Sequence, residues 1–95
     1  MKVRDGVISL EVCGEFLLVA TRTAAPFCPM RFSQLNASGR KIWEALAQGE
    51  SPEQLTLRLQ AEYPNAAAAI AADVRAFCAG MVEKGFLCKD GEDDG

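Results

Sequence analysis

The stretch Leu35–Leu46, LNASGRKIWEAL, decides the order of elements in this chain. It has the pattern of a strand that runs directly into a helix. Asn36 or Ser38 can begin that helix, because a short side-chain oxygen accepts a backbone N–H left free in the first turn. The apolar side chains that follow at helical spacing are Ile42, Trp43 and Leu46. Segments before this stretch have strand and turn patterns, and segments after it have helix patterns.

Length and composition predict one small folded domain over residues 1–89 and an acidic, disordered tail over 90–95. The tail holds four of the 13 acidic residues, so the remainder carries nine acidic against ten basic side chains. A balance so close to neutral gives no electrostatic attraction to nucleic acid. We see no signal peptide and no run of about 18 apolar residues, so we expect a cytoplasmic protein that does not contact the membrane.

Three strands are predicted in the first third of the chain. Residues 7–12 alternate between apolar and polar side chains and should form a half-buried strand, and residues 15–21 should pair with it as a hairpin. A loop with two prolines over residues 22–29 precedes a short third strand at residues 30–35. The mixed pattern of this third strand is typical of a sheet edge, where free backbone groups can receive a peptide.

Three helices follow. The first covers residues 37–47, and the second begins at Ser51 with the pattern of a capping box and ends near Tyr63. The third runs from about residue 66 to 84 and carries an apolar stripe of Ile70, Val74, Phe77 and Met81. Gly80 lies inside this helix, and we expect a packing contact to explain it, with close approach of a ligand as the alternative. The order predicts an α+β, winged helix-turn-helix-like fold: a three-stranded antiparallel sheet followed by three helices.

The sequence offers no catalytic set. It contains no histidine, no phosphate-binding loop, and four cysteines without a Cys-x-x-Cys pair, so we predict no enzyme, no metal and no cofactor. The cysteines are expected to be free and buried or half-buried. Cys28, which lies in the proline-containing loop, is the thiol to test for reactivity.

The chain resembles the PqqD family of small peptide chaperones, also called RiPP recognition elements. The likeness covers roughly residues 5 to 88. The first residues that carry it are Leu35–Gly39. They continue with Ile42, Trp43, Leu46, Gly49, Glu53, Leu55, Tyr63, Asp73, Val74, Phe77, Met81 and Gly85–Leu87. Each motif is simple, but their order and spacing together are specific.

This resemblance implies that the chain binds the leader segment of a ribosomally synthesised precursor peptide and presents it to a modifying enzyme, often of the radical SAM type. In the family the leader adds as a strand beside the third strand and lies against the third helix. Carried over by position, the implied peptide-binding residues are Met30, Arg31, Phe32, Ser33, Gln34, Ala69, Asp73, Ala76, Phe77 and Gly80. Arg31 and Arg75 could meet acidic residues of the peptide, and Ser33→Pro is expected to remove an edge donor.

Two alternatives stay open beside this reading. One is a DNA-binding winged helix, whose reading helix over residues 53–62 would carry a single basic side chain, Arg58. The other is a structural or oligomerisation module, in which the apolar run Phe16–Val19 supports a homodimer. The precursor, the enzyme and the pathway are not determined by the sequence.

Overall fold

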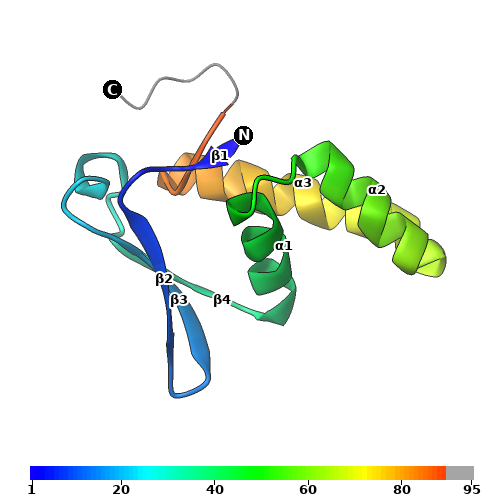
Figure 1. The fold of residues 1–95 in the computed structure, drawn as a ribbon, viewed down its shortest axis with the longest axis horizontal. Helices are drawn as coiled ribbons and strands as arrows, with labels where there is room; N and C mark the ends of the chain where they lie inside the picture. Colours follow the sequence, from blue (N-terminus) through cyan, green and yellow to red (C-terminus); the bar gives the residue numbers. More distant parts are fainter. Residues whose placement is uncertain (90–95) are drawn as a thin grey trace.

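The computed structural model describes residues 1–89, and the acidic tail predicted for 90–95 lies outside the described residues. A three-stranded antiparallel sheet in the order β2-β3-β4 lies beside three helices (Figure 1). Its strands are β2 (Val7–Val12), β3 (Glu15–Ala20) and β4 (Phe32–Leu35). The α+β, winged helix-turn-helix-like arrangement predicted from the sequence is therefore confirmed.

The hairpin of β2 and β3 closes through Cys13 and Gly14, whose φ angles are 51° and 82°. Positive φ at both central residues is the mark of a two-residue turn that matches the strand twist. In β3 the side chains of Phe16, Leu18 and Ala20 are buried, and those between them are half-buried. The prediction of a half-buried β2 is wrong, because most of this strand is exposed.

The three helices begin and end close to the predicted residues. They are α1 (Ala37–Ala47), α2 (Pro52–Glu62) and α3 (Ala67–Lys84), with 3₁₀ turns at Ala25–Phe27 and Pro64–Ala66. Asn36, rather than Ser38, starts α1, since its Oδ1 accepts the Gly39 N–H at 2.8 Å. The predicted capping box of α2 is present: Ser51 and Gln54 bond each other's backbone N–H reciprocally.

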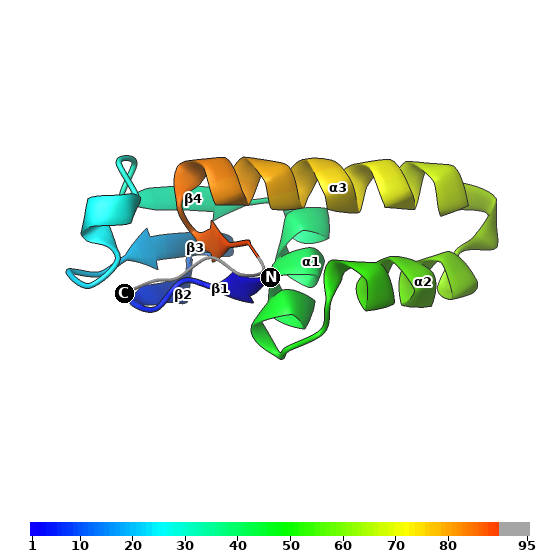
Figure 2. The same ribbon diagram turned by 90° about the horizontal axis from the view of Figure 1, so that it is seen from above.

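The core lies between the inner face of the sheet and the helices. The helical side chains buried there include Ile42, Trp43, Leu46, Leu55, Val74 and Met81. α2 and α3 run side by side, as both views show (Figure 2). Leu57 of α2 is 69% exposed. It does not share the buried position of Leu55, because residues two apart do not share a helical face.

The sequence analysis missed a second, smaller sheet. β1 (Lys2–Val3) pairs with β5 (Leu87–Cys88) and brings the start of the chain against the residues that follow α3. Two-residue strands are too short to show a period, so no pattern could reveal them. Leu87 and Cys88 are fully buried in this pairing.

By length and composition alone, the helical segment Pro64–Lys84 would be able to cross a membrane. Its hydropathy owes much to alanines, which also favour helices in soluble proteins. In this fold the segment packs against α1, α2 and β5, and its side chains Val74, Cys78 and Met81 are buried. It is thus the long core helix of a small globular domain.

The turn after α3 is fixed by a contact with the proline-containing loop. Gly85 has a φ of 90°, and a Cβ placed on it would lie 1.8 Å from the Phe27 carbonyl oxygen. Buried Arg4 completes the junction: its Nε donates to the Gly85 carbonyl at 2.6 Å, and its guanidinium lies 4.2 Å from the centre of the Phe27 ring. The N-terminus, the loop and the end of α3 therefore meet at one point.

We expect Gly85→Ala to lower the free energy of unfolding by about 3 kcal/mol or more, because it adds a backbone clash to the cost of a left-handed residue. Gly49→Ala is the matched control. Gly49 has a φ of 100° but no atom within 4 Å of the added Cβ, so this change should cost only about 1–2 kcal/mol. Urea denaturation of both variants measures the difference, and equal losses would contradict the importance of the Phe27 contact.

Candidate functional site

The outer edge of β4 has no strand partner within the described part of the chain, since the sheet ends there. In an antiparallel ladder, successive residues direct their backbone groups alternately to one neighbour and to the other. The Ala20 N–H donates to the Arg31 carbonyl at 2.7 Å, which fixes this alternation. Ser33 and Leu35 consequently face β3, whereas Phe32 and Gln34 direct their backbone groups to the free edge.

This alternation corrects the expectation for Ser33. Its N–H belongs to the β3–β4 ladder, so proline there would break the sheet rather than its edge. The Phe32 N–H already donates to the Met30 carbonyl in a tight turn. The edge groups that remain available to an added strand are the Phe32 carbonyl and both backbone groups of Gln34.

Met30 and Arg31 precede the strand rather than forming its start. Arg31 has a φ of 59°, and its N–H donates to the Cys28 carbonyl at 3.0 Å. Its side-chain Nε donates to the Ala20 carbonyl at 3.2 Å, which holds the guanidinium at the end of β3. The predicted third strand thus begins two residues later than expected, because a left-handed residue ends the extended conformation.

Two close contacts hold α3 beside β4. At one end Gly85 meets Phe27, just before the strand. At the other end a Cβ on Gly39 would lie 3.2 Å from Phe77 Cε2 and 3.6 Å from Leu35 Cβ, which places the Phe77 ring at the end of the strand. The segment of α3 from Phe77 to Gly85 therefore spans the length of β4, and helix and strand lie on the same side of the molecule in Figure 2.

The predicted α3 residues divide along the helix. Ala76, Phe77 and Gly80 lie in the half of α3 beside β4, and Phe77 and Gly80 are half-buried. Ala69 lies eight residues before Phe77, about 12 Å along the axis and past the end of the strand. Asp73 lines a separate hollow of about 190 Å³ between the three helices.

One further residue, Lys84, was missed by the sequence reasoning. It lies one turn after Gly80, is exposed, and continues the same stripe into the last turn of α3. The helical spacing of 77, 80 and 84 would have been sufficient to find it. Lys84 is thus a cation on the face of α3 that also carries Phe77 and Gly80.

Gly80 has no packing partner. A Cβ built on it meets no atom within 4 Å, so the prediction of a packing reason for this glycine is wrong. A glycine inside a helix costs about 1 kcal/mol relative to alanine. The open space above it leaves close approach of another chain as the explanation that the geometry allows.

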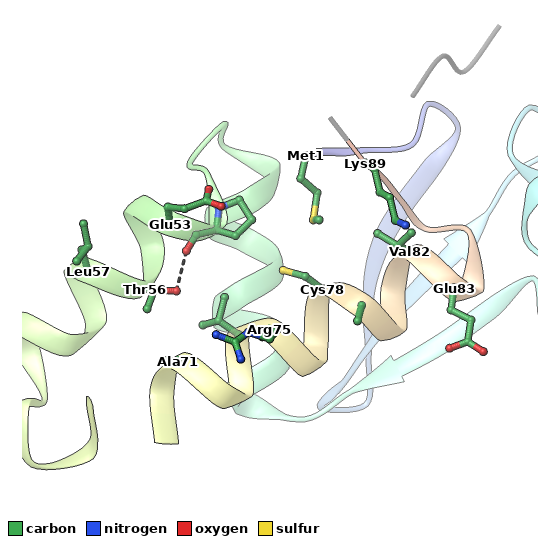
Figure 3. Close-up of a pocket in the computed structure, with 13 residues that line it drawn as sticks. Met1, Glu53, Thr56, Leu57, Ala71, Arg75, Cys78, Val82, Glu83 and Lys89 are labelled. Atoms are coloured by element: carbon green, nitrogen blue, oxygen red, sulfur yellow. Dashed lines mark hydrogen bonds between the residues drawn. The ribbon is translucent and has the colours of Figure 1, made fainter. Parts of the chain in front are cut away.

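A separate hollow lies elsewhere, between α2 and α3 (Figure 3). It has a volume of about 830 Å³ and contains none of the predicted peptide-binding residues. Arg75 lines this hollow, on the helix face opposite Phe77, so it cannot meet a peptide beside β4. The hollow is open at its rim, where Met1, Glu53 and Lys89 lie.

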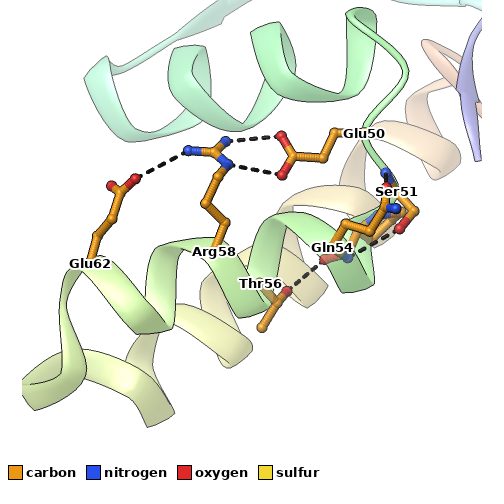
Figure 4. A network of polar contacts seen from close by, with 7 residues as sticks. Glu50, Ser51, Gln54, Thr56, Arg58 and Glu62 are labelled. Atoms are coloured by element: carbon orange, nitrogen blue, oxygen red, sulfur yellow. Dashed lines mark hydrogen bonds and ion pairs between the residues drawn. The ribbon is translucent and has the colours of Figure 1, made fainter.

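Arg58 of α2 is paired with two carboxylates, those of Glu50 before the helix and Glu62 in its last turn (Figure 4). Arg58 donates from Nε and Nη2 to the Glu50 carboxylate, both at 2.9 Å, and its Nη1 lies 3.5 Å from Glu62. This bond to Arg58 lowers the pKa of Glu50. The single basic side chain of the helix is therefore neutralised, which leaves a DNA-reading helix without a cation for phosphate.

Three of the four thiols are buried, as predicted, whereas Cys13 is exposed in the hairpin turn, where the prediction of a buried or half-buried thiol is wrong. Burial raises the pKa of Cys28, although Arg4 and Arg31 oppose the shift, and burial also raises the pKa of Cys78. Cys28, the thiol that the sequence singled out for a test of reactivity, is therefore a poor nucleophile. Within residues 1–89 no group of three His, Cys, Asp or Glu side chains is placed to hold a metal ion.

The comparison with protein families decides the identity of this fold. The family model described as coenzyme PQQ synthesis protein D (PqqD) matches residues 15–87. The chain belongs to the PqqD family. Among solved structures this PqqD-family chain is similar to TbiB1 in complex with the TbiA(beta) leader peptide, with a TM-score of 0.72 and 29% identity over 92% of this chain and 94% of that chain. No curated protein matches it.

Cysteine accessibility gives a direct test of the thiol assignments. With an excess of a thiol-specific reagent, we expect Cys13 to react within minutes, because it lies exposed in the hairpin turn. The other thiols should react only as the protein opens, since protonated, buried thiols are slow nucleophiles. Mass spectrometry of peptide fragments identifies the labelled residue. Labelling of Cys28 in the folded protein as fast as Cys13 would contradict the burial described above.

Proposed function

We propose that this PqqD-family chain binds the leader segment of a ribosomally synthesised precursor peptide as an extra strand on β4. The observation that carries the proposal is the unpaired backbone edge of β4 beside α3. An added strand gains backbone hydrogen bonds that depend little on its side chains. The structural similarity to TbiB1, which was solved with a leader peptide, supports leader binding here.

The leader would lie between the edge of β4 and the segment of α3 from Phe77 to Lys84. Gln34 supplies backbone groups, and the half-buried Phe77 ring supplies an apolar wall at the end of the strand. Lys84 offers a charge partner for an acidic leader residue. Ordering a flexible leader costs several kcal/mol, so a dissociation constant on the order of 0.1–10 μM is expected.

The same proposal includes the role after binding. The chain would present the leader to a peptide-modifying enzyme, with radical SAM enzymes as the expected class, and would itself perform no catalysis. A cytoplasmic site of action follows from that role, because precursor peptides are made there. A homodimer through Phe16–Val19 is a weaker idea, since Phe16 and Leu18 lie in the monomer core.

Proline substitutions test the edge assignment. Gln34→Pro should weaken leader binding at least tenfold and leave folding nearly intact, because proline removes a donor only from the free edge. Ser33→Pro should instead destabilise the fold by about 3 kcal/mol, since it removes a bond from the β3–β4 ladder. Fluorescence polarisation with a labelled leader peptide, paired with thermal denaturation, measures both effects. Unchanged leader affinity in Gln34→Pro would overturn the proposed site.

Gly80 provides a second test. Gly80→Leu should stabilise the free protein by about 0.5–1 kcal/mol through helix propensity, because the space around it is open. The same change should weaken leader binding at least fivefold, since the new side chain occupies the groove. Ala68→Leu is the control on the exposed, opposite face of α3, and it should leave leader affinity unchanged. Equal leader affinity in Gly80→Leu and the wild type would place the peptide away from α3.

A further inference from the structure

The hydrophobic side of β2 faces away from the protein's own core. Ser9 and Glu11 lie opposite the buried residues Leu18 and Phe16, so the polar side chains of β2 share the inner face. Glu11 accordingly forms an ion pair with Arg40 of α1 at 3.1 Å. The apolar side chains of the strand project outward and are 43–49% exposed: Ile8, Leu10 and Val12. The folding of this chain does not explain why β2 turns its polar side chains inward and its apolar side chains outward.

The same apolar surface continues across the sheet to β4. Cross-strand partners share a face, and the register places Leu17 and Val19 beside the outward residues of β2, with Phe32 next to Val19. We call this surface the outer sheet face; its residues are Ile8, Leu10, Val12, Leu17, Val19 and Phe32. Phe32 is 62% exposed. The hairpin extends beyond the helices, which pack on the other side (Figure 1).

The outer sheet face carries no charged residue of its own. None of its six residues is charged, and the polar side chains at its end, Gln34 and Glu15, bond each other. A partner would therefore present an apolar, uncharged surface rather than a charged patch. Contiguous exposed apolar surfaces of this kind mark interaction sites on proteins of this size.

The size of the face favours a partner other than a second copy. The six side chains expose on the order of 400–500 Å², whereas a stable interface buries about 800 Å² on each partner. Two copies pressed together through this face alone would fall short. A strand added to β4 changes this, because every second side chain of the strand would lie on the outer face, next to Phe32. The bound leader would widen the apolar surface.

We propose that the outer sheet face, extended by the outward side chains of the bound leader, docks the peptide-modifying enzyme. This inference rests on the proposed function and adds the place and the order of docking. The enzyme binds the leader-loaded protein more tightly than the free protein. By thermodynamic linkage, the enzyme then raises the affinity of the protein for the leader by the same factor.

The test compares two aspartate substitutions on neighbouring residues of β2. Leu10→Asp places a charge on the outer sheet face, and Ser9→Asp places the same charge on the other, exposed face of the strand. Leader affinity is measured by fluorescence polarisation. Binding of the full-length peptide-modifying enzyme encoded beside this chain is measured by biolayer interferometry, with and without the leader. Circular dichroism confirms that each variant is folded, and Val12→Asp replaces Leu10→Asp if the latter unfolds.

We expect wild-type protein to bind the enzyme at least fivefold more tightly when the leader is present. Leu10→Asp should bind the leader within twofold of wild type, yet lose at least tenfold in affinity for the enzyme. Ser9→Asp should behave as wild type in both assays. This combination separates docking from peptide binding, because β2 lies two strands away from the free edge of β4.

Three results would overturn the docking proposal. The first is equal enzyme affinity for Leu10→Asp and wild type. The second is enzyme affinity in the wild type that does not respond to the leader. The third is a wild-type dimer, seen by light scattering, that becomes monomeric only in Leu10→Asp, which would assign the face to a second copy. Failure of wild-type protein to bind any leader would appear in the polarisation assay alone and would overturn the proposed function itself.

Discussion

The contact between Gly85 and the Phe27 carbonyl fixes the distance between α3 and β4. No side chain fits between these two backbones, since even a Cβ would lie 1.8 Å from the carbonyl oxygen. Arg4 ties the same point to the N-terminus by bonding the Gly85 carbonyl and by covering the Phe27 ring. With Phe77 placed against Gly39 and Leu35 at the far end, the helix is held along the whole strand. These two contacts therefore fix the position of α3 along β4.

Alternate residues of β4 contribute to different surfaces of this protein. In β4 one set of residues bonds β3 and turns its side chains inward, while the other set faces the free edge and turns its side chains outward. Phe32 belongs to the second set, so it connects the edge of the sheet with the outer sheet face. A peptide bound at the edge would necessarily contribute to that face. In the proposal made above, binding of the leader and docking of the enzyme are therefore linked by geometry.

Much of the fold could be predicted from local chemistry. The Asn36 cap, the capping box at Ser51 and Gln54, and the glycine after α3 each act within a few residues, and each is present in the structure. The apolar stripe of α3 likewise follows from helical spacing. The predictions that failed concern which elements contact one another in space. Burial of β2, the partner of Gly80 and the direction of Arg75 depend on which elements cover which face, and a single sequence does not contain that information.

The candidate site shows the same division. The resemblance placed the peptide beside the third strand and the third helix, and Phe32, Gln34, Phe77 and Gly80 do lie along this groove in the structure. Arg31, Ser33 and Ala69 do not contribute as expected: the first two are bound to β3 or its end, and the third lies past the end of β4. Which residues of β4 face the free edge, and how far α3 overlaps the strand, depend on the tertiary structure.

By itself the sequence determined the number and order of the helices and main strands, and nearly all of the helix boundaries, because caps, turns and apolar spacing are local. It also led to the prediction of a binding protein, since histidine is missing and the cysteines are scattered. Only the tertiary structure decided which backbone groups of β4 are free and which side of the sheet stays uncovered. Those two features depend on pairing between segments far apart in the chain, where each residue's partner is set by the whole fold.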